Sequence, residues 1–141
     1  GKNVESLIRD SNVSDQVSNI SKIREVRDKL IDFQQKICSK KNVVMDGRDI
    51  GTKVMPDADI KFFVTADVSV RTQRRFDELR SYDNNLTYAK VLANLNKRDS
   101  DDMGRKINPL LKATDAIVID NTFLSFVDQN EFVFNLIKNY R

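Results

Sequence analysis

The sequence predicts an α/β protein with a parallel sheet flanked by helices. Three short apolar runs, at 43–45, 60–65 and 116–120, alternate with segments whose apolar residues recur every three or four positions. Compact apolar runs are typical of parallel strands that are covered on both faces, and a spacing of three and four is typical of amphipathic helices. Strand and helix signals that alternate along one chain indicate the α/β class.

Composition limits the domain organisation and the kind of site. The chain has 141 residues, of which 40% are hydrophobic and 32% are charged, so we expect one soluble domain with one core. No apolar run reaches the length of a membrane span and no N-terminal run resembles a signal peptide, which favours a cytoplasmic location. Cys38 is the single cysteine and histidine is absent, so disulfides, zinc enzymes and triad hydrolases are disfavoured.

The first helix is predicted from Ser21 onward, before the strand at 43–45. Its apolar residues are spaced so that they form one buried stripe. They are Ile23, Val26, Leu30, Phe33 and Ile37.

Three further helices follow the strand signals. Asp67 can cap a helix after the strand at 60–65, Thr87 can start a helix that runs through Leu95, and Ser125 with Asp128 forms a capping-box signal for the last helix. The polar segment 81–85 separates the two middle helices. Its composition suits either a mobile flap or an ordinary surface loop.

The first candidate site follows the strand at 43–45. Two glycines, Gly47 and Gly51, flank the charged pair Arg48 and Asp49. In an open α/β sheet, ligands bind beyond the carboxyl ends of the strands, and glycines let the backbone come close to a ligand. We therefore expect this turn to bind an anionic group.

The second candidate site is the charged segment 97–105. The inward face of the helix that starts at Thr87 continues onto Arg98, Asp102 and Arg105. Inward charges are costly unless they pair with each other or with a ligand, which indicates a polar cleft. A frayed, solvated helix end with a pair such as Arg98 and Asp102 fits the spacing equally well.

The arginines in these two segments suggest that the anion is a phosphate. Arg48, Arg98 and Arg105 each carry a guanidinium fork, which binds phosphate oxygens through two hydrogen bonds. Another arginine cluster lies at positions 71, 74, 75 and 80. Such a cluster is usually a solvated helix face, but beside a phosphate cleft it could close over transferring phosphates and stabilise their charge.

Together these motifs resemble the bacterial cytidylate kinase family, the P-loop kinases that transfer the terminal phosphoryl group of ATP to CMP or dCMP. The resemblance covers essentially the whole chain, including the neighbourhoods of Ile8 and Ser18. It rests on Val44-Met45-Asp46-Gly47-Arg48-Asp49-Ile50-Gly51-Thr52, Pro56-Asp57-Ala58, Arg74-Arg75, and Lys97-Arg98-Asp99 followed by Asp102 and Arg105.

The resemblance implies a CMP site. Arg48 and Arg105 would hold the CMP phosphate, while Asp49 and Arg27 would face the cytosine. The chemistry of the base agrees, because cytosine offers an exocyclic amino donor beside ring acceptors, which a carboxylate and a guanidinium complement.

The resemblance also assigns the sugar and the donor nucleotide. Ser18, Arg98 and Asp102 would contact the sugar, and Arg98 would join Arg48 and Arg105 as the catalytic arginines that clamp the acceptor. Asp46 resembles the acidic residue that P-loop enzymes place near Mg²⁺, directly or through water. The resemblance further implies a lid segment near 71–90. Its arginines Arg71, Arg74 and Arg75 would meet the ATP phosphates.

One departure from the family pattern is large. None of the glycines, at positions 1, 47, 51 and 104, belongs to a Gly-x-x-x-x-Gly-Lys-Ser/Thr motif, so the P-loop is absent. We therefore interpret residues 1–141 as the C-terminal part of a kinase core, in which 1–20 end the CMP-binding insertion. The N-terminal strand, P-loop and helix would come from the same or another chain, and the isolated chain is expected to have little or no activity.

Two alternative functions remain at this stage. The arginines could serve a non-catalytic basic module that binds RNA or a partner chain, or an inactive kinase remnant, although the aromatic residues mostly fall on apolar stripes rather than where bases would stack. Membrane binding is not expected. Within enzymes the nearest competitor is another nucleoside monophosphate kinase, against which Asp49 with Arg27 favours cytosine.

Overall fold

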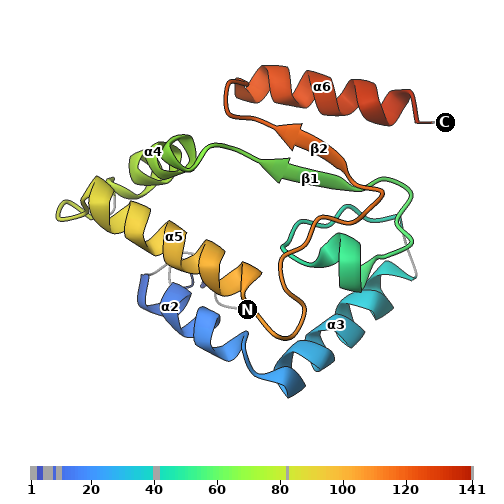
Figure 1. The fold of residues 1–141 in the computed structure, drawn as a ribbon, viewed down its shortest axis with the longest axis horizontal. Helices are drawn as coiled ribbons and strands as arrows, with labels where there is room; N and C mark the ends of the chain where they lie inside the picture. The colour runs from blue at the N-terminus through green and yellow to red at the C-terminus, as the bar shows by residue number, and fades with distance from the viewer. Residues whose placement is uncertain (1–2, 5–7, 9–10, 40–41, 82, 141) are drawn as a thin grey trace.

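The computed structural model describes residues 3–4, 8, 11–39, 42–81 and 83–140 (Figure 1). Within these residues the predicted α/β class is confirmed. Strand β1 (Phe62–Thr65) pairs in parallel with β2 (Ile117–Asp120), and the register aligns Phe62 with Ile117 and Thr65 with Asp120. The strand signals at 60–65 and 116–120 are therefore confirmed, with each strand slightly shorter than its apolar run.

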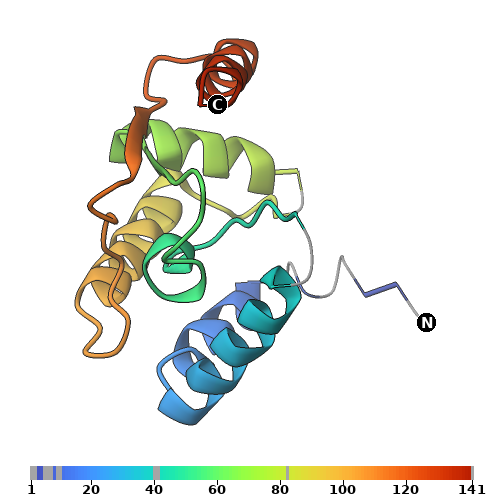
Figure 2. The same ribbon diagram turned by 90° about the vertical axis from the view of Figure 1, so that its right-hand side faces the viewer.

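Helices make up most of the remaining structure. Along the chain they are α2 (Ser11–Ile20), α3 (Arg24–Cys38), the π-helical turn η1 (Ile50–Val54), α4 (Val68–Leu79), α5 (Tyr88–Met103) and α6 (Phe126–Lys138). In both views α2 and α3 lie at one end of the molecule, and the strands with α6 lie at the other (Figure 2). Helix α5 and η1 lie between these ends, and they carry or adjoin both candidate sites.

The small core includes residues of the packed helices α4 and α5 and of the sheet. Ile119 of β2 and Thr72 of α4 have almost no exposed surface, and Val91 of α5 is buried. The rings of Phe76 and Tyr88 meet edge to face with their centroids 6.3 Å apart. Packing of this kind fixes α5 relative to α4, so the two helices hold their charged residues in one arrangement.

The caps that sequence predicts are confirmed. The Asp67 side chain accepts a hydrogen bond from the backbone N–H of Ser69 (2.7 Å), and Thr87 caps α5 through Lys90. Ser125 and Asp128 form the expected capping box at the start of α6. Each cap satisfies backbone N–H groups that the first helical turn leaves without partners.

The prediction of a strand at 43–45 is wrong. Residues 42–46 form neither a helix nor a strand, and Val44 is fully exposed. A strand exists only when its backbone groups pair with a neighbouring strand, and the two-stranded sheet contains only β1 and β2. The apolar run is present, but the chain described here supplies no strand beside it.

The expectation that the sheet is covered on both faces is also wrong. Val64 of β1 is 56% exposed and Val118 of β2 is 49% exposed. Apolar exposure continues on α6, where Phe126 and Phe134 are largely open to solvent. Val64 pairs with Ile119 and Val118 pairs with Phe63, so the two exposed valines lie on opposite faces of the sheet.

Candidate functional site

The loop that follows residues 42–46 places Arg48 and Asp49 at the head of η1. The backbone N–H of Lys53 donates to the carbonyl of Asp49 (2.9 Å), which ties the loop to the π-helical turn. A Cβ atom at Gly47 would lie 2.8 Å from Cγ1 of Ile50, so a side chain at position 47 would force Ile50 to move. Gly47 thus allows the tight approach that presents Arg48 and Asp49 together.

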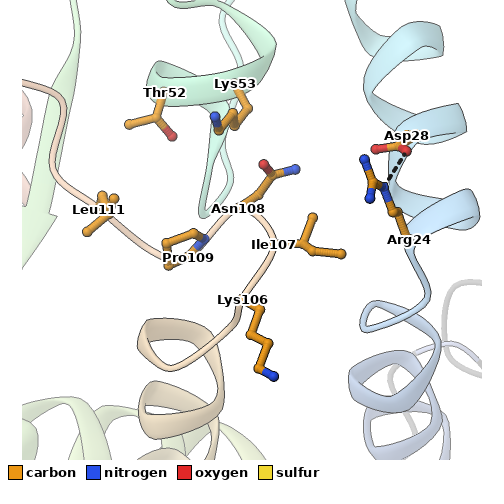
Figure 3. Close-up of a pocket in the computed structure, with 9 residues that line it drawn as sticks. All are labelled: Arg24, Asp28, Thr52, Lys53, Lys106, Ile107, Asn108, Pro109 and Leu111. Carbon is orange, nitrogen blue, oxygen red and sulfur yellow. Dashed lines mark ion pairs between the residues drawn. The ribbon is translucent and has the colours of Figure 1, made fainter.

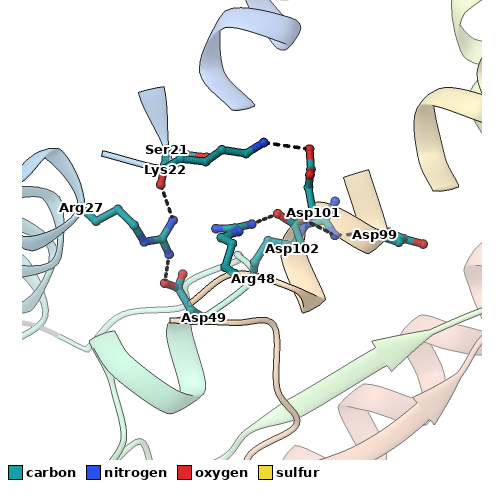
Figure 4. A network of polar contacts seen from close by, with 9 residues as sticks. Ser21, Lys22, Arg27, Arg48, Asp49, Asp99, Asp101 and Asp102 are labelled. Atoms are coloured by element: carbon teal, nitrogen blue, oxygen red, sulfur yellow. Dashed lines mark hydrogen bonds and ion pairs between the residues drawn. The ribbon is translucent and has the colours of Figure 1, made fainter. Parts of the chain in front are cut away.

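Arg27 of α3 and Asp49 form an ion pair with little exposure to water (Figure 4). The side chains are 10% and 17% exposed. Nη2 of Arg27 contacts Oδ2 of Asp49, and Nη1 donates to the backbone carbonyl of Ser21 (3.1 Å). Among the described residues, Nε of Arg27 is the buried side-chain atom that lacks a hydrogen-bond partner. An unpaired buried donor is costly, so this nitrogen lowers the stability of the folded site.

Asp102 of α5 brings two of the predicted phosphate-binding arginines together. Its Oδ2 lies 2.8 Å from Nη1 of Arg48 (Figure 4). Its Oδ1 pairs with Nη2 of Arg105. Asp102 and Arg105 are nearly buried, whereas the Arg48 side chain is 39% exposed. The alternative pair of Arg98 with Asp102 is not formed. The inward face of α5 is therefore polar, and it meets the loop that carries Arg48.

Positive charge is crowded around this network. Burial lowers the pKa of Arg98 from its usual value, and the nearby guanidinium groups of Arg48 and Arg75 lower it further. Burial also lowers the pKa of Arg105, and Arg27 adds to this effect. These groups stay charged, but they repel one another in a partly desolvated setting. A bound anion would relieve that repulsion.

Two cavities adjoin the network. One, of about 490 Å³, lies beside the pair of Arg27 and Asp49. It is lined by Ser21, Lys22, Arg27, Ser100, Asp101, Gly104, Arg105, Lys106 and Ile107. The other, of about 550 Å³, lies between the Arg48 loop and β1 and extends to Arg71 and Asp99. Its lining includes Asp46, Arg48 and Thr65 together with apolar residues of β1 and α5.

A third cavity of about 540 Å³ adjoins the first through Lys106 and Ile107 (Figure 3). It is formed by the start of α3, η1 and the loop after α5, where Asn108 adopts a positive φ of 50°. Its lining residues are Arg24, Asp28, Thr52, Lys53, Lys106, Ile107, Asn108, Pro109 and Leu111, and none of them is a predicted site residue.

The predicted lid arginines have different environments. Nη1 of Arg71 lies 2.7 Å from Oδ2 of Asp99, close to the network. Arg75 pairs with Glu78 (2.8 Å) on its own helix. Arg74 instead donates to the side chain and the backbone carbonyl of Asn121, each at 2.9 Å, so it holds the turn between β2 and α6.

The remaining predicted residues are Ser18 and Asp46. Ser18 belongs to α2, but its side chain lies outside the described part of the structure. Asp46 is exposed at the end of residues 42–46 and lines the cavity beside Arg48. No group of three or more histidine, cysteine or acidic residues suited to a metal ion occurs among the described residues.

Sequence reasoning missed two charged residues on α5, Asp99 and Asp101. Asp99 pairs with Arg71 and Arg48, and Asp101 pairs with Lys22 (3.2 Å) across the smaller cavity. The spacing of Asp99 and Asp102 by three residues on one helix was the available signal, because such residues share a face.

The fold and the site define an α/β protein in which partly buried arginines and carboxylates are paired beside two cavities. The helices of the described residues include none that is long and apolar enough to span a membrane.

Comparison with known proteins identifies the family. The family model described as cytidylate kinase matches residues 1–139. The chain is 47% identical to a cytidylate kinase of Flavobacterium psychrophilum over 97% of this chain and 61% of that protein. It is 47% identical to a cytidylate kinase of Phocaeicola vulgatus, over 93% of this chain and 57% of that protein. It is 46% identical to a cytidylate kinase of Caldicellulosiruptor bescii, over 96% of this chain and 60% of that protein. The chain belongs to the cytidylate kinase family, a family of nucleoside monophosphate kinases, and spans about 60% of the length of these relatives.

Proposed function

We propose that this chain supplies the acceptor site and the lid of an enzyme that transfers a phosphoryl group from ATP to CMP or dCMP, giving CDP or dCDP. The observation that carries the proposal is the convergence of Arg48 and Arg105 on Asp102, next to the buried pair of Arg27 and Asp49. A phosphate-binding pair of guanidinium groups thus lies beside a pair of groups that can read a base edge. The role fits pyrimidine nucleotide metabolism.

The base would bind in the cavity of about 490 Å³ that Arg27 lines. Arg27 lines this cavity, so its guanidinium group would donate to the ring acceptors of cytosine, and the Asp49 carboxylate would accept from its amino group. Uracil has a carbonyl where cytosine has the amino group, so its carbonyl oxygen and the Asp49 carboxylate would be two acceptors that face each other without a proton between them. The pair therefore favours cytosine.

The CMP phosphate would bind to Arg48 and Arg105, and Arg98 would complete the clamp and contact the sugar. The mutual repulsion of these guanidinium groups supports an anionic ligand. Asp102 would accept from a sugar hydroxyl while it holds both arginines in place. The assignment of Ser18 to the sugar stays a prediction.

On the donor side, Arg71, Arg74 and Arg75 of α4 would meet the ATP phosphates when the segment near 71–90 closes as a lid. Arg71 already lies at the cavity beside Arg48. Arg74 would first have to leave Asn121, to which it donates two hydrogen bonds. Closure of such a segment would exclude water and surround the transferring group with positive charge.

Asp46 is the residue we propose near Mg²⁺. A single exposed carboxylate fits this ion, which commonly keeps several waters and is held by one or two carboxylates and the substrate phosphates. When bound, Mg²⁺ would neutralise charge on the phosphate oxygens. Asp46 itself would orient the water shell from the end of residues 42–46.

The phosphate oxygen of CMP is already ionised near neutral pH, so transfer needs positioning and charge stabilisation more than a general base. The chain has no histidine, which is compatible with this chemistry. Arg48, Arg98 and Arg105 would fix the nucleophilic oxygen in line with the donor phosphate, and the lid would exclude water that competes as an acceptor.

We also propose that a further strand, from the same or another chain, enters beside β1 and brings the P-loop. The support is the unpaired run 42–46, the exposed Val64 and Val118, and the cavity of about 550 Å³ between the Arg48 loop and β1. A strand placed there could pair with both 42–46 and β1 and would cover apolar surface.

Substitution of Arg48 tests the acceptor site. Loss of a charge-assisted hydrogen bond costs about 1.5–3 kcal/mol, so Arg48→Ala should weaken CMP binding by about 10- to 100-fold in calorimetry of the 141-residue chain. Arg24→Ala is the matched control, because the Arg24 side chain is 73% exposed on α3. Equal CMP affinity of the Arg48 variant and the native chain would contradict the assignment, as would tight binding of an RNA oligomer without binding of CMP.

A further inference from the structure

The Asp99 carboxylate is shared between arginines of two different elements. Its Oδ2 lies 2.7 Å from Nη1 of Arg71 on α4, and its Oδ1 lies 3.6 Å from Nη1 of Arg48 in the loop before η1. The Asp99 side chain is only 17% exposed, so water screens these interactions weakly. Asp99 thereby connects the loop that would bind the acceptor phosphate with the helix that would carry the lid.

The two arginines are held unequally. Arg71 has a second anchor, because its Nε donates to the backbone carbonyl of Ala66 (3.0 Å) at the junction of β1 and α4. Arg48 has its closer partner in Asp102, at 2.8 Å. Asp99 therefore interacts mainly with Arg71 and only weakly with Arg48, and Arg48 shares its closer partner Asp102 with Arg105.

We propose that Asp99 is a positioning residue that couples Arg48 to Arg71, so that the state of the lid arginine sets how strongly the acceptor arginine binds phosphate. The proposal rests on the function proposed above. While Arg71 keeps its position on α4, the Asp99 carboxylate pairs mainly with Arg71. When Arg71 moves away from Asp99 to bind another anion, Asp99 can pair more closely with Arg48. Asp99 then competes with the acceptor phosphate for the Arg48 guanidinium group.

The coupling has a definite sign. Withdrawal of Arg71 should weaken phosphate binding at Arg48, although Arg71 is assigned no contact with CMP. Simple loss of a nearby positive charge would also weaken anion binding, but that effect does not need Asp99. A double-mutant cycle with Arg71→Ala and Asp99→Asn separates the two explanations, because it isolates the part of the effect that passes through the carboxylate.

The first test uses the ligand-free chain. In nitrogen-15-labelled protein, the Nε–Hε resonance of Arg48 should shift in Arg71→Ala, and the same substitution should leave that resonance unchanged in the Asp99→Asn background. Arg80→Ala at the C-cap of α4 is the matched control, because Arg80 pairs with Asp77 and its side chain is 64% exposed. An Arg48 resonance that does not respond to Arg71→Ala, or that responds equally in both backgrounds, would overturn the proposal.

The second test measures CMP affinity by calorimetry in the same four proteins. Arg71→Ala should weaken CMP binding about three- to tenfold in the native background and less than about twofold in Asp99→Asn. Equal losses in both backgrounds would show that Asp99 is not the link. If the native chain binds no CMP, the proposed function is contradicted, whereas the coupling between the arginines is still decided by the resonance of Arg48.

Discussion

Substitution of Asp49 by asparagine should destabilise the fold through Arg27. The change keeps the side-chain volume but removes the negative charge that faces a guanidinium with only 10% of its side-chain surface exposed. Removal of one partner from a buried ion pair costs about 3–5 kcal/mol, because the other charge stays buried without compensation. Arg27 retains the carbonyl of Ser21 and borders a cavity that water can enter, which reduces the expected loss to about 2 kcal/mol.

Urea unfolding followed by far-ultraviolet circular dichroism measures this loss. A decrease of about 2 kcal/mol in the free energy of unfolding should lower the melting temperature by about 6 °C in a chain of this size. Asp28→Asn is the control, because Asp28 pairs with Arg24 on the exposed face of α3 and should change stability by less than about 0.5 kcal/mol. If the Asp49 and Asp28 variants unfold at the same urea concentration, the ion pair of Arg27 has no special role in the fold.

Three further results are expected. Ser125→Ala should lower the free energy of unfolding by about 1 kcal/mol, measured by urea titration, because it removes the cap of α6; an unchanged midpoint would contradict the role of the cap. The hydrogen bond from the Ser69 hydroxyl is the main cause of the lowered pKa of Asp67. The ionised Asp67 carboxylate therefore stabilises the fold at pH values above the ordinary carboxyl pKa, and this stabilisation is lost as pH falls through the lower pKa of the folded state. Stability should therefore fall less steeply below about pH 4 in Asp67→Asn, and equal slopes would argue against the effect. Raising the salt concentration from about 0.05 to 0.5 M should weaken CMP binding severalfold in calorimetry, and salt-independent affinity would contradict a phosphate held by partly exposed arginines.

Local features of the fold were predictable from sequence because they depend on neighbouring residues. The caps at Asp67, Thr87 and Ser125 each need one side chain and the following helical turn. The strand expected at 43–45 depends instead on a partner strand, which no local pattern can supply. The exposure of Val64 has the same origin, since a covered sheet needs elements that lie beyond the strand itself.

The site was predictable to a different extent. Helical spacing predicted that Asp102 and Arg105 share one face of the helix, but α5 ends at Met103 and Arg105 lies beyond it. The structure nevertheless joins both residues to Arg48. Helical spacing could not determine the direction of Arg74, because the turn between β2 and α6 provides carbonyl acceptors that compete for it. Asp99 was missed because its partners come from two distant segments, which meet only in the folded chain.

Direct titration of the native 141-residue chain with nucleotides tests the central claim that it carries a CMP acceptor site. Calorimetry with CMP, dCMP, UMP, AMP and an RNA oligomer at one salt concentration gives the affinities on a common scale. We expect CMP and dCMP to bind at least about tenfold more tightly than UMP or AMP, because only cytosine satisfies both Arg27 and Asp49. Equal affinity for CMP and UMP, or binding of RNA without binding of CMP, would contradict the claim.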